Sequence, residues 1–371
     1  MSAAPDDAAD AADASGVGSS PAPPPTVTVI MTALEEEKHL TAAVESVFTQ
    51  DYDGPLDLVV AVGPSRDSTR ALADRLAREH ADRMQVVDNP TGRTPAGLNR
   101  AIAAIGPGTT VVVRTDGHAT LPPSYVRTAV DVLQRTGAAN VGGMMVPEGS
   151  TTFERAVARA MSEPIGLGSV PFHVGGEAGP ADTVYLGVFT RSVLDKTGGF
   201  DEHFARAQDW ELNHRIRDLG ETVWFDPRLQ VTYRPRPNLR RLATQFHGSG
   251  RWRWQIIRAY PATASARYLA APGTTFVLGA AAATLIGNAA TRRNRVVGAI
   301  AGAAPAGYLA VVLGGAARSR RGLSRGASAW YPAVLVTMHL SWGSGFLAEM
   351  FSDAVTAARG RRRRVPVGGG R

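Results

Sequence analysis

Apolar and polar positions follow two different rhythms along the chain. Over residues 26–118, short β-branched runs alternate with stretches whose apolar residues recur every three to four positions. The runs predict strands and the stretches predict helices. The predicted strands are Val27–Met31, Leu56–Val62, Met84–Val87 and Thr110–Val113, and the predicted helices are Glu35–Phe48, Ser68–His80 and Pro95–Ile105. This alternation predicts an α/β fold with a mostly parallel sheet, in which ligands bind beyond the carboxyl ends of the strands.

The C-terminal third has another pattern, in which long uncharged stretches are separated by arginine clusters. The stretches are Ala270–Ala290, Val296–Ala317 and Ala327–Ala348. Each is about as long as the roughly 20 residues that cross a bilayer. We therefore expect about three membrane segments in an α-helical region over residues 269–350. Ala/Gly-rich soluble helices are the alternative. The arginine clusters do not fix the orientation, although we expect the catalytic domain on the cytoplasmic face of the cell membrane.

The remaining segments take their character from composition. Residues 1–25 contain mainly Ala, Asp, Gly, Ser and Pro and cannot build a core, so they predict a disordered leader. Residues 234–268 combine arginine with Phe246, Trp252, Trp254 and Tyr260, as interfacial helices do. A surface helix packed on the preceding domain is the alternative. Residues 351–371 read as a basic tail, which leaves residues 26–233 as the α/β domain.

Charge is divided unequally between these parts. The net charge is +7, yet residues 231–371 contain 21 arginines and only two acids, Glu349 and Asp353. That part therefore carries +19, and residues 1–230 carry −12. A basic segment indicates an anionic surface, either nucleic acid or membrane. The adjacent uncharged stretches favour anionic membrane lipid, and we expect no nucleic-acid partner. The chain has no cysteine, which excludes thiol nucleophiles and zinc–thiolate sites.

The first candidate for chemistry follows the predicted strand Thr110–Val113. The polar turn Arg114–His118 places the carboxylate of Asp116 at the strand's end. A carboxylate there can hold a divalent cation that neutralises phosphates, and His118 offers a second ligand. The simpler interpretation is an ordinary Asp-Gly turn.

The second candidate is a pair of carboxylates, Asp209 and Glu211, at the start of a short amphipathic helix that carries Leu212, Ile216 and Leu219. Carboxylates in a first helical turn are favourable through the helix dipole alone. The functional interpretation is a general base that removes a proton from an acceptor hydroxyl.

Together and in this order, these segments resemble family 2 glycosyltransferases of the GT-A fold, and more narrowly the ExoA-like succinoglycan-biosynthesis type. The resemblance rests on segments of residues 26–258 and on the membrane-bound C-terminal region. The segments are Val27–Leu40, Ser46–Tyr52, Asp57–Thr69, Asn89–Asn99, Val113–Ala119, Leu186–Phe204 and Gln208–Leu212. It implies a GT-A nucleotide-diphospho-sugar transferase domain, a nucleotide-sugar donor and a divalent metal, Mg²⁺ or Mn²⁺.

The resemblance also implies roles for particular residues. Asp209 matches the general base, and Asp116 matches the metal-binding carboxylate of the DxD motif, with His118 as a further ligand. Residues implied at the nucleotide are Ala33, Glu35, Asp67, Arg93, Thr115 and Asp116. Residues implied on the acceptor and donor-sugar side are Asp182, Gly187, Gln208, Glu211, Arg251 and Trp252.

Several positions depart from the family pattern. Arg114 stands where the first DxD carboxylate usually lies, and Glu35 replaces the usual Asn of the first turn. Val62 and Gly63 replace two acidic residues that often contact the nucleotide, which makes a uridine donor less secure. Gln208 replaces the Glu before the base.

We therefore expect a membrane-anchored inverting glycosyltransferase that transfers a sugar to a hydroxyl of a lipid-linked or growing cell-surface polysaccharide. One alternative is a synthase that transfers sugar directly to polyprenyl phosphate, whose phosphate nucleophile needs no strong base. The other is a non-catalytic membrane scaffold that keeps the GT-A shape. Because Asp116 and Asp209 occur in the same chain, we favour an enzyme.

Overall fold

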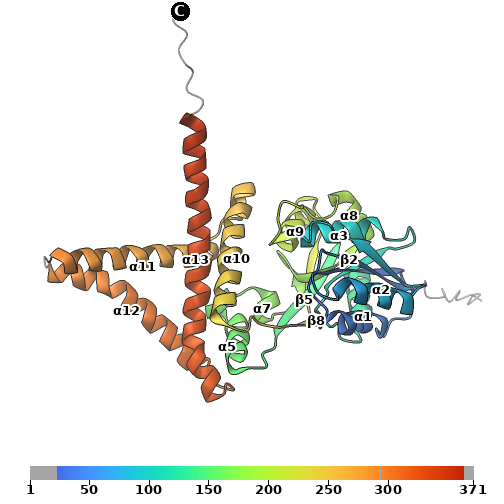
Figure 1. Ribbon diagram of the computed structural model, residues 1–371, viewed down its shortest axis with the longest axis horizontal. Helices are drawn as coiled ribbons and strands as arrows, with labels where there is room; N and C mark the ends of the chain where they lie inside the picture. Colours follow the sequence, from blue (N-terminus) through green and yellow to red (C-terminus); the bar gives the residue numbers. More distant parts are fainter. Residues whose placement is uncertain (1–22, 292–293, 363–371) are drawn as a thin grey trace, which may run out of the picture.

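The computed structural model describes residues 23–291 and 294–362, which form an α/β unit and a helical region side by side (Figure 1). The leader predicted over residues 1–25 lies outside the described residues except for its last three positions. The basic tail predicted over residues 351–371 is helical as far as it is described, because the last helix continues to Arg362.

One eight-stranded sheet forms the centre of the α/β unit, in the order β3-β2-β1-β4-β7-β5-β8-β6. The strands are β1 Val27–Ala33, β2 Leu56–Val62, β3 Met84–Asp88, β4 Val111–Asp116, β5 Asn140–Pro147, β6 Gly179–Pro180, β7 Tyr185–Thr190 and β8 Val223–Tyr233. The pairs β1–β2, β2–β3, β1–β4 and β5–β8 are parallel, whereas β7 runs antiparallel to β4 and β5. The predicted α/β fold with a mostly parallel sheet is confirmed.

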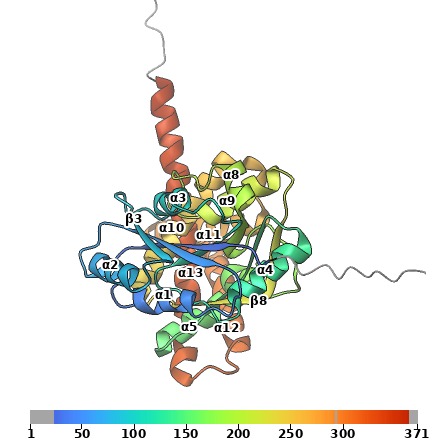
Figure 2. The same cartoon turned by 90° about the vertical axis from the view of Figure 1, so that its right-hand side faces the viewer.

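Helices cover both faces of the sheet. The helices of this unit are α1 Leu40–Phe48, α2 Thr69–Glu79, α3 Thr94–Ala103, α4 Tyr125–Thr136, α5 Thr152–Met161, α6 Pro164–Leu167, α7 Pro171–Val174, α8 Arg191–Thr197 and α9 Gln208–Asp218. Successive β1 side chains point to opposite faces. Met31 therefore packs with α1, α2 and α4, and Ile30 packs with α3, α8 and α9. Figure 2 shows α3, α8 and α9 on one side of the sheet and α1 on the other.

Two of the local predictions are wrong in ways that matter for the site. The helix predicted from Glu35 begins only at Leu40, because Glu35 adopts a left-handed φ of 59° that no α-helix contains. The turn predicted over Arg114–His118 is partly strand, since β4 continues to Asp116. Arg114 and Thr115 are therefore buried inside the sheet. Leu219, expected on the apolar face of its helix, lies beyond α9 and is 53% exposed.

The helical region consists of α10 Leu239–Ala259, the short turn η1 Pro261–Thr263, α11 Ala266–Thr291, α12 Arg295–Arg318 and α13 Arg325–Arg362. Helix α10 does not lie free on a surface, because Leu242 and Phe246 are buried against α5 and α13. Gly250 and Gly345 bring the two helix backbones together: an added Cβ would lie 1.9 Å from Trp342 O and 2.0 Å from His247 O.

Helices α11 and α12 extend away from the sheet (Figure 1). They are the two described helices that are long and apolar enough to cross a membrane, and only 11% of the apolar window in each is buried. The third predicted span falls within α13, which does not meet this criterion. Its middle is instead buried in protein through Tyr331, Leu335 and Phe346.

Candidate active site

A buried arginine joins the two carboxylates that the sequence singles out. Arg114 lies in β4 with 4% of its side chain exposed. Its Nη1 donates to Asp209 Oδ2 at 2.6 Å, and its Nη2 donates to Asp116 Oδ1 at 2.9 Å. The guanidinium therefore links the end of β4 to the start of α9. Its Nε, which is also buried, has no acceptor among the described residues.

The backbone places both carboxylates at the carboxyl end of the sheet. β4 pairs with β1 up to the Thr32–Asp116 register, and the following Gly117 donates its N–H to Thr32 O. An added Cβ on Gly117 would lie 3.0 Å from that oxygen, so the turn favours glycine. On the other side, Ala207 has a left-handed φ of 60° and caps α9, whose second residue is Asp209.

Of the two carboxylates, Asp209 is a better candidate for proton transfer than Asp116. Burial raises the pKa of Asp209, and the ion pair with Arg114 opposes that rise. Its side chain keeps 28% of its surface exposed. Its Oδ1 is buried and has no hydrogen-bond partner within the described residues. The group is therefore a partly exposed carboxylate with one oxygen held by Arg114 and one buried oxygen left without a partner.

The predicted metal ligands form an incomplete set. Within the described residues, no group of three or more His, Asp, Glu or Cys side chains is arranged to hold a metal ion. Asp116 is 21% exposed and has one oxygen on Arg114. His118 shares a 2.7 Å hydrogen bond through Nδ1 with Glu36, which raises the pKa of His118. Asp116 and the Nε2 atom of His118 are the two predicted ligands at this end of the sheet.

The predicted nucleotide-side residues lie on two loops that are hydrogen-bonded to each other. The loop after β1 begins at Ala33, and the loop after β2 contains Asp67. Glu35 Oε1 accepts from Arg66 N at 2.7 Å, and Glu37 N donates to Asp67 Oδ2 at 3.2 Å. A hydrogen bond from Thr69 holds the pKa of Asp67 below its usual range. Glu35 and Asp67 thus fix the shape of these loops.

Two further nucleotide-side residues flank this edge. Thr115 is fully buried in β4, and its Oγ1 has no partner among the described residues. Arg93 precedes α3, and its Nη2 donates to His203 O at 3.2 Å. This bond ties the loop before α3 to the segment before α9.

The residues predicted on the acceptor side are of two kinds. Some lie around the carboxylates, and others hold the fold together. Gly187 has φ 119° in β7, and an added Cβ would collide with Phe189, so the strand bend requires glycine. Gln208 is buried at the start of α9. Glu211 is fully buried, paired with Arg215 through both oxygens, and accepts from Tyr260 at 2.9 Å. Glu211 therefore anchors α9 rather than facing a substrate.

In the part of the chain that the structure describes, the other three acceptor-side positions form their ion pairs and ring contacts with residues outside the Asp116–Arg114–Asp209 cluster. Asp182 lies 3.7 Å from Arg217 and is 65% exposed. Arg251 pairs with Glu349 of α13 at 2.7 Å. Trp252 packs near Phe204. Of these, Trp252 lies nearest to the segment that leads into α9.

The sequence did not single out Tyr185 or the group of residues around Trp210. The buried hydroxyl of Tyr185 has a raised pKa, caused mainly by burial and also by the charges of Asp116 and Asp209, so it adjoins the cluster. Trp210, His214 and Arg217 line a cavity of about 640 Å³ between α9 and residues 262–268. Their spacing of four and three residues is the signal that places them on one face of a helix.

The chain is similar to a known protein family and to several known proteins. The model of the family described as "Glycosyltransferase like family 2" matches residues 23–254. The chain is 29% identical over 323 residues to the succinoglycan biosynthesis protein ExoA of Rhizobium meliloti, covering 87% of this chain and 94% of that protein.

Two more distant proteins are also similar. A Methanococcus voltae dolichyl N-acetyl-α-D-glucosaminyl phosphate 3-β-D-2,3-diacetamido-2,3-dideoxy-β-D-glucuronosyltransferase is 22% identical over 241 residues, or 62% of this chain and 74% of that protein. The solved structure of the mannosyltransferase PcManGT from Pyrobaculum calidifontis, in complex with GDP-Man and Mn²⁺, superposes with a TM-score of 0.60. It has 20% identity, and the match covers 88% of each chain. That likeness shows the GT-A fold.

Proposed function

The chain belongs to the glycosyltransferase-like family 2 and is a glycosyltransferase, and from this premise we propose that it is a membrane-anchored inverting enzyme. It moves a sugar from a nucleotide-sugar donor to a hydroxyl of a lipid-linked or growing cell-surface polysaccharide acceptor. The observation that carries this proposal is Asp209, a partly exposed carboxylate with a raised pKa that Arg114 links to Asp116.

The proton-transfer step belongs to Asp209. Its carboxylate takes the proton of the acceptor hydroxyl as that oxygen bonds to the anomeric carbon of the donor sugar. The bond between the anomeric carbon and the diphosphate breaks, and its electron pair leaves with the diphosphate. A single displacement from the opposite face inverts the anomeric configuration. The raised pKa makes Asp209 a stronger base than an ordinary aspartate.

Arg114 is a positioning residue in this scheme. Its two hydrogen bonds fix the separation of Asp209 and Asp116, and its positive charge opposes the rise in the pKa of Asp209 that burial causes. A carboxylate at position 114 would instead add a third negative charge to this buried cluster. Arg114 thus allows a base and a donor-side carboxylate to lie at one end of the sheet.

A divalent cation fits the remaining donors of this end of the sheet. Asp116 Oδ2 makes no hydrogen bond within the described residues, and the electrostatic interaction of His118 with Asp116 places the two side chains near each other. Asp116 and His118 would hold the metal, and diphosphate oxygens and water would complete an Mg²⁺ or Mn²⁺ shell. When bound, such a cation supplies positive charge to the departing diphosphate. The Mn²⁺ and GDP-Man of the Pyrobaculum structure support this donor chemistry.

The site residues on the two nucleotide-side loops serve donor binding. Ala33, Glu35 and Asp67 shape the loops after β1 and β2, while Thr115 and Arg93 flank the same edge. On the acceptor side, Gly187 and Gln208 shape the approach to Asp209. We assign Asp182, Glu211 and Arg251 to structural ion pairs, and Trp252 to the wall beside Phe204.

Membrane attachment is the second part of the proposal. Large apolar side chains on α11 and α12 face outward, including Ile286 at 71% and Ile300 at 69% exposure. Surfaces of this kind need an apolar partner, and hydrocarbon supplies one. The arginines that flank these helices suit anionic headgroups. We place the α/β unit on the cytoplasmic face, where nucleotide sugars are made available to polysaccharide-forming enzymes.

The test is a screen of nucleotide sugars against the full chain in detergent. Thermal stabilisation with Mg²⁺ or Mn²⁺ identifies the donor, and transfer to a membrane lipid extract follows. A sugar on an acceptor hydroxyl supports the proposal. A sugar on polyprenyl phosphate itself assigns the synthase instead, and the absence of both transfer and hydrolysis for every donor assigns a scaffold.

A further inference from the structure

The cavity between α9 and residues 262–268 offers hydrogen-bond donors that have no acceptor. Trp210 Nε1, Arg217 Nε and Ser265 Oγ are buried on its walls, and none has a partner within the described residues. The Trp and Arg nitrogens can only donate. Buried donors of this kind are costly unless a ligand accepts from them. The cavity therefore suits a group rich in acceptor oxygens.

The charges around this cavity also favour a group rich in acceptor oxygens, and one that is negatively charged. Arg217 and Arg267 line it, and Arg253 stacks between the rings of Trp210 and Tyr268 at 4.8 and 3.8 Å. Buried Nη1 of Arg253 also has no acceptor among the described residues. The single acid on the wall is Asp182, within 3.7 Å of both Arg217 and Arg267. The two wall guanidinium groups, with that of Arg253 held against the rings of Trp210 and Tyr268, outnumber the one carboxylate and favour a phosphate.

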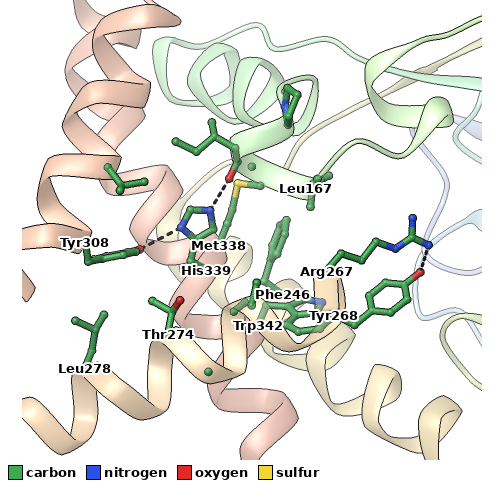
Figure 3. A pocket seen from close by; sticks show the side chains of 18 of the residues that line it. Leu167, Phe246, Arg267, Tyr268, Thr274, Leu278, Tyr308, Met338, His339 and Trp342 are labelled. Atoms are coloured by element: carbon green, nitrogen blue, oxygen red, sulfur yellow. Dashed lines mark hydrogen bonds between the residues drawn. The ribbon is translucent and has the colours of Figure 1, made fainter. Parts of the chain in front are cut away.

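A larger cavity of about 770 Å³ adjoins the first one and is apolar. It is lined by α6, α10, α11, α12 and α13, and both cavities share Arg267 and Tyr268. Figure 3 shows Leu278 and Tyr308 at one end of the larger cavity and Arg267 with Tyr268 at the other. The wall residue His339 is already satisfied, because Nε2 donates to Ile165 O at 2.7 Å and Nδ1 accepts from Tyr308.

We propose that the two cavities together bind the lipid carrier of the acceptor, a polyprenyl phosphate or diphosphate that bears the growing sugar. Its phosphate lies among Arg217, Arg253 and Arg267, and its isoprenoid chain fills the apolar cavity. This inference rests on the proposed function and names its acceptor. The isoprenoid chain can arrive from the bilayer because α11 and α12, the two described helices of membrane-spanning length, both line the apolar cavity.

The first cavity and the base lie on the same helix. Trp210, which lines the cavity, follows Asp209 on α9, although consecutive helix residues point to different sides. A sugar joined to the bound phosphate therefore starts at the helix that carries the base. An ordinary membrane phospholipid has no sugar hydroxyl to present at this position, which is why we commit to the polyprenyl carrier.

The test measures lipid binding to the full chain in detergent by native mass spectrometry. The probes are a long-chain polyprenyl phosphate and, as competitor, phosphatidylglycerol. Arg267→Gln removes a phosphate contact, and Leu278→Trp fills the apolar cavity. We expect each to weaken polyprenyl-phosphate binding about tenfold. The matched controls are Arg258→Gln on α10 and Phe276→Trp on α11, both exposed residues outside the cavities, and these should bind like the parent.

Several outcomes overturn the inference. These are a parent protein that does not bind the polyprenyl phosphate, cavity variants that bind like their controls, and phosphatidylglycerol that competes as well as the polyprenyl lipid. Donor hydrolysis is measured in the same preparations. If donor hydrolysis persists while the cavity variants bind the lipid as well as the parent does, the inference fails and the proposed function stands. If the lipid binds as expected but no donor is turned over, the proposed function fails instead.

Discussion

The α/β unit and the helices α11 and α12 each place one kind of side chain where it is least expected. In the α/β unit, a charged arginine is almost fully enclosed, with Arg114 at 4% exposure between two carboxylates. On α11 and α12, large aliphatic residues such as Ile286 and Ile300 face outward. The difference teaches how each part treats its unusual side chains. Charge inside the first is held by paired partners, and the apolar surface on the second is the basis for the membrane attachment that we propose.

Removing the proposed general base, Asp209, should have the largest effect on activity. Asp209→Asn keeps the shape of the side chain but cannot accept a proton, so kcat should fall about a thousandfold. Nucleotide binding, measured by calorimetry, should change by less than about threefold, since the diphosphate side is untouched. Asp195→Asn, an exposed aspartate on α8, is the control. Retention of activity within about threefold would remove Asp209 from the mechanism.

Removing the buried cation should affect both stability and pH dependence. Arg114→Met leaves two neighbouring carboxylates without a counter-charge and should cost about 3 kcal/mol of unfolding free energy. Because Arg114 opposes the rise in the pKa of Asp209, its loss should raise that pKa further. The acidic limb of the kcat profile should then move to higher pH, since Asp209 must be ionised to act.

The control for that variant is Arg191→Met, which removes the exposed i,i+4 pair with Asp195 and should change the unfolding free energy by about 0.5 kcal/mol or less. A purely structural Arg114 would reduce the yield of folded protein while leaving the acidic limb in place. An unchanged limb in the surviving folded fraction therefore rejects its electrostatic role.

Replacing one exposed leucine with aspartate in each part tests whether the two surfaces contact the same medium. Leu309 of α12 and Leu219 after α9 are 52% and 53% exposed. Leu309→Asp should weaken membrane insertion by about 3 kcal/mol, whereas Leu219→Asp should be nearly neutral. The measurement is the fraction of each variant that resists carbonate extraction from membranes. Equal behaviour of the two variants would mean that α12 contacts water, as Leu219 does.

The smallest effect is expected at a partly exposed ion pair inside the helical region, between α10 and α13. Glu349→Gln weakens the contact with Arg251, which is 52% exposed, whereas Glu349 is 12% exposed and also accepts from Gln255. Its loss should cost about 1 kcal/mol or less. Transfer activity should not change if Arg251 is structural, and a loss of activity above about tenfold would return Arg251 to the acceptor site.

Local patterns predicted the parts of the fold that depend on local chemistry. The β-branched run Leu56–Val62 matches β2 from end to end. β4 was predicted too short because Arg114 reads as a turn residue in the sequence. Only its pairing with Asp209, 95 positions away, makes it acceptable inside a strand. The packing of α13 on α10 shows the same limit, because it is not visible in the composition of either segment.

For the candidate site, too, the sequence indicated some residues, and only the fold shows how they contact one another. The order of family motifs indicated Asp116 and Asp209, and the structure links them through Arg114. It also gives Glu211 two partners, Arg215 and Tyr260, that no local pattern reveals. The paired cavities combine residues from seven separate segments, so a sequence without a fold cannot assemble them.

The most direct test of the account is the anomeric configuration of the first sugar linkage that the enzyme makes. A nucleotide sugar of known configuration is incubated with the full chain and its acceptor, and the new linkage is assigned by proton NMR before any rearrangement. The account predicts the inverted configuration, because Asp209 activates the acceptor for a single displacement. A retained configuration would contradict it, since retention requires a second displacement or a different path.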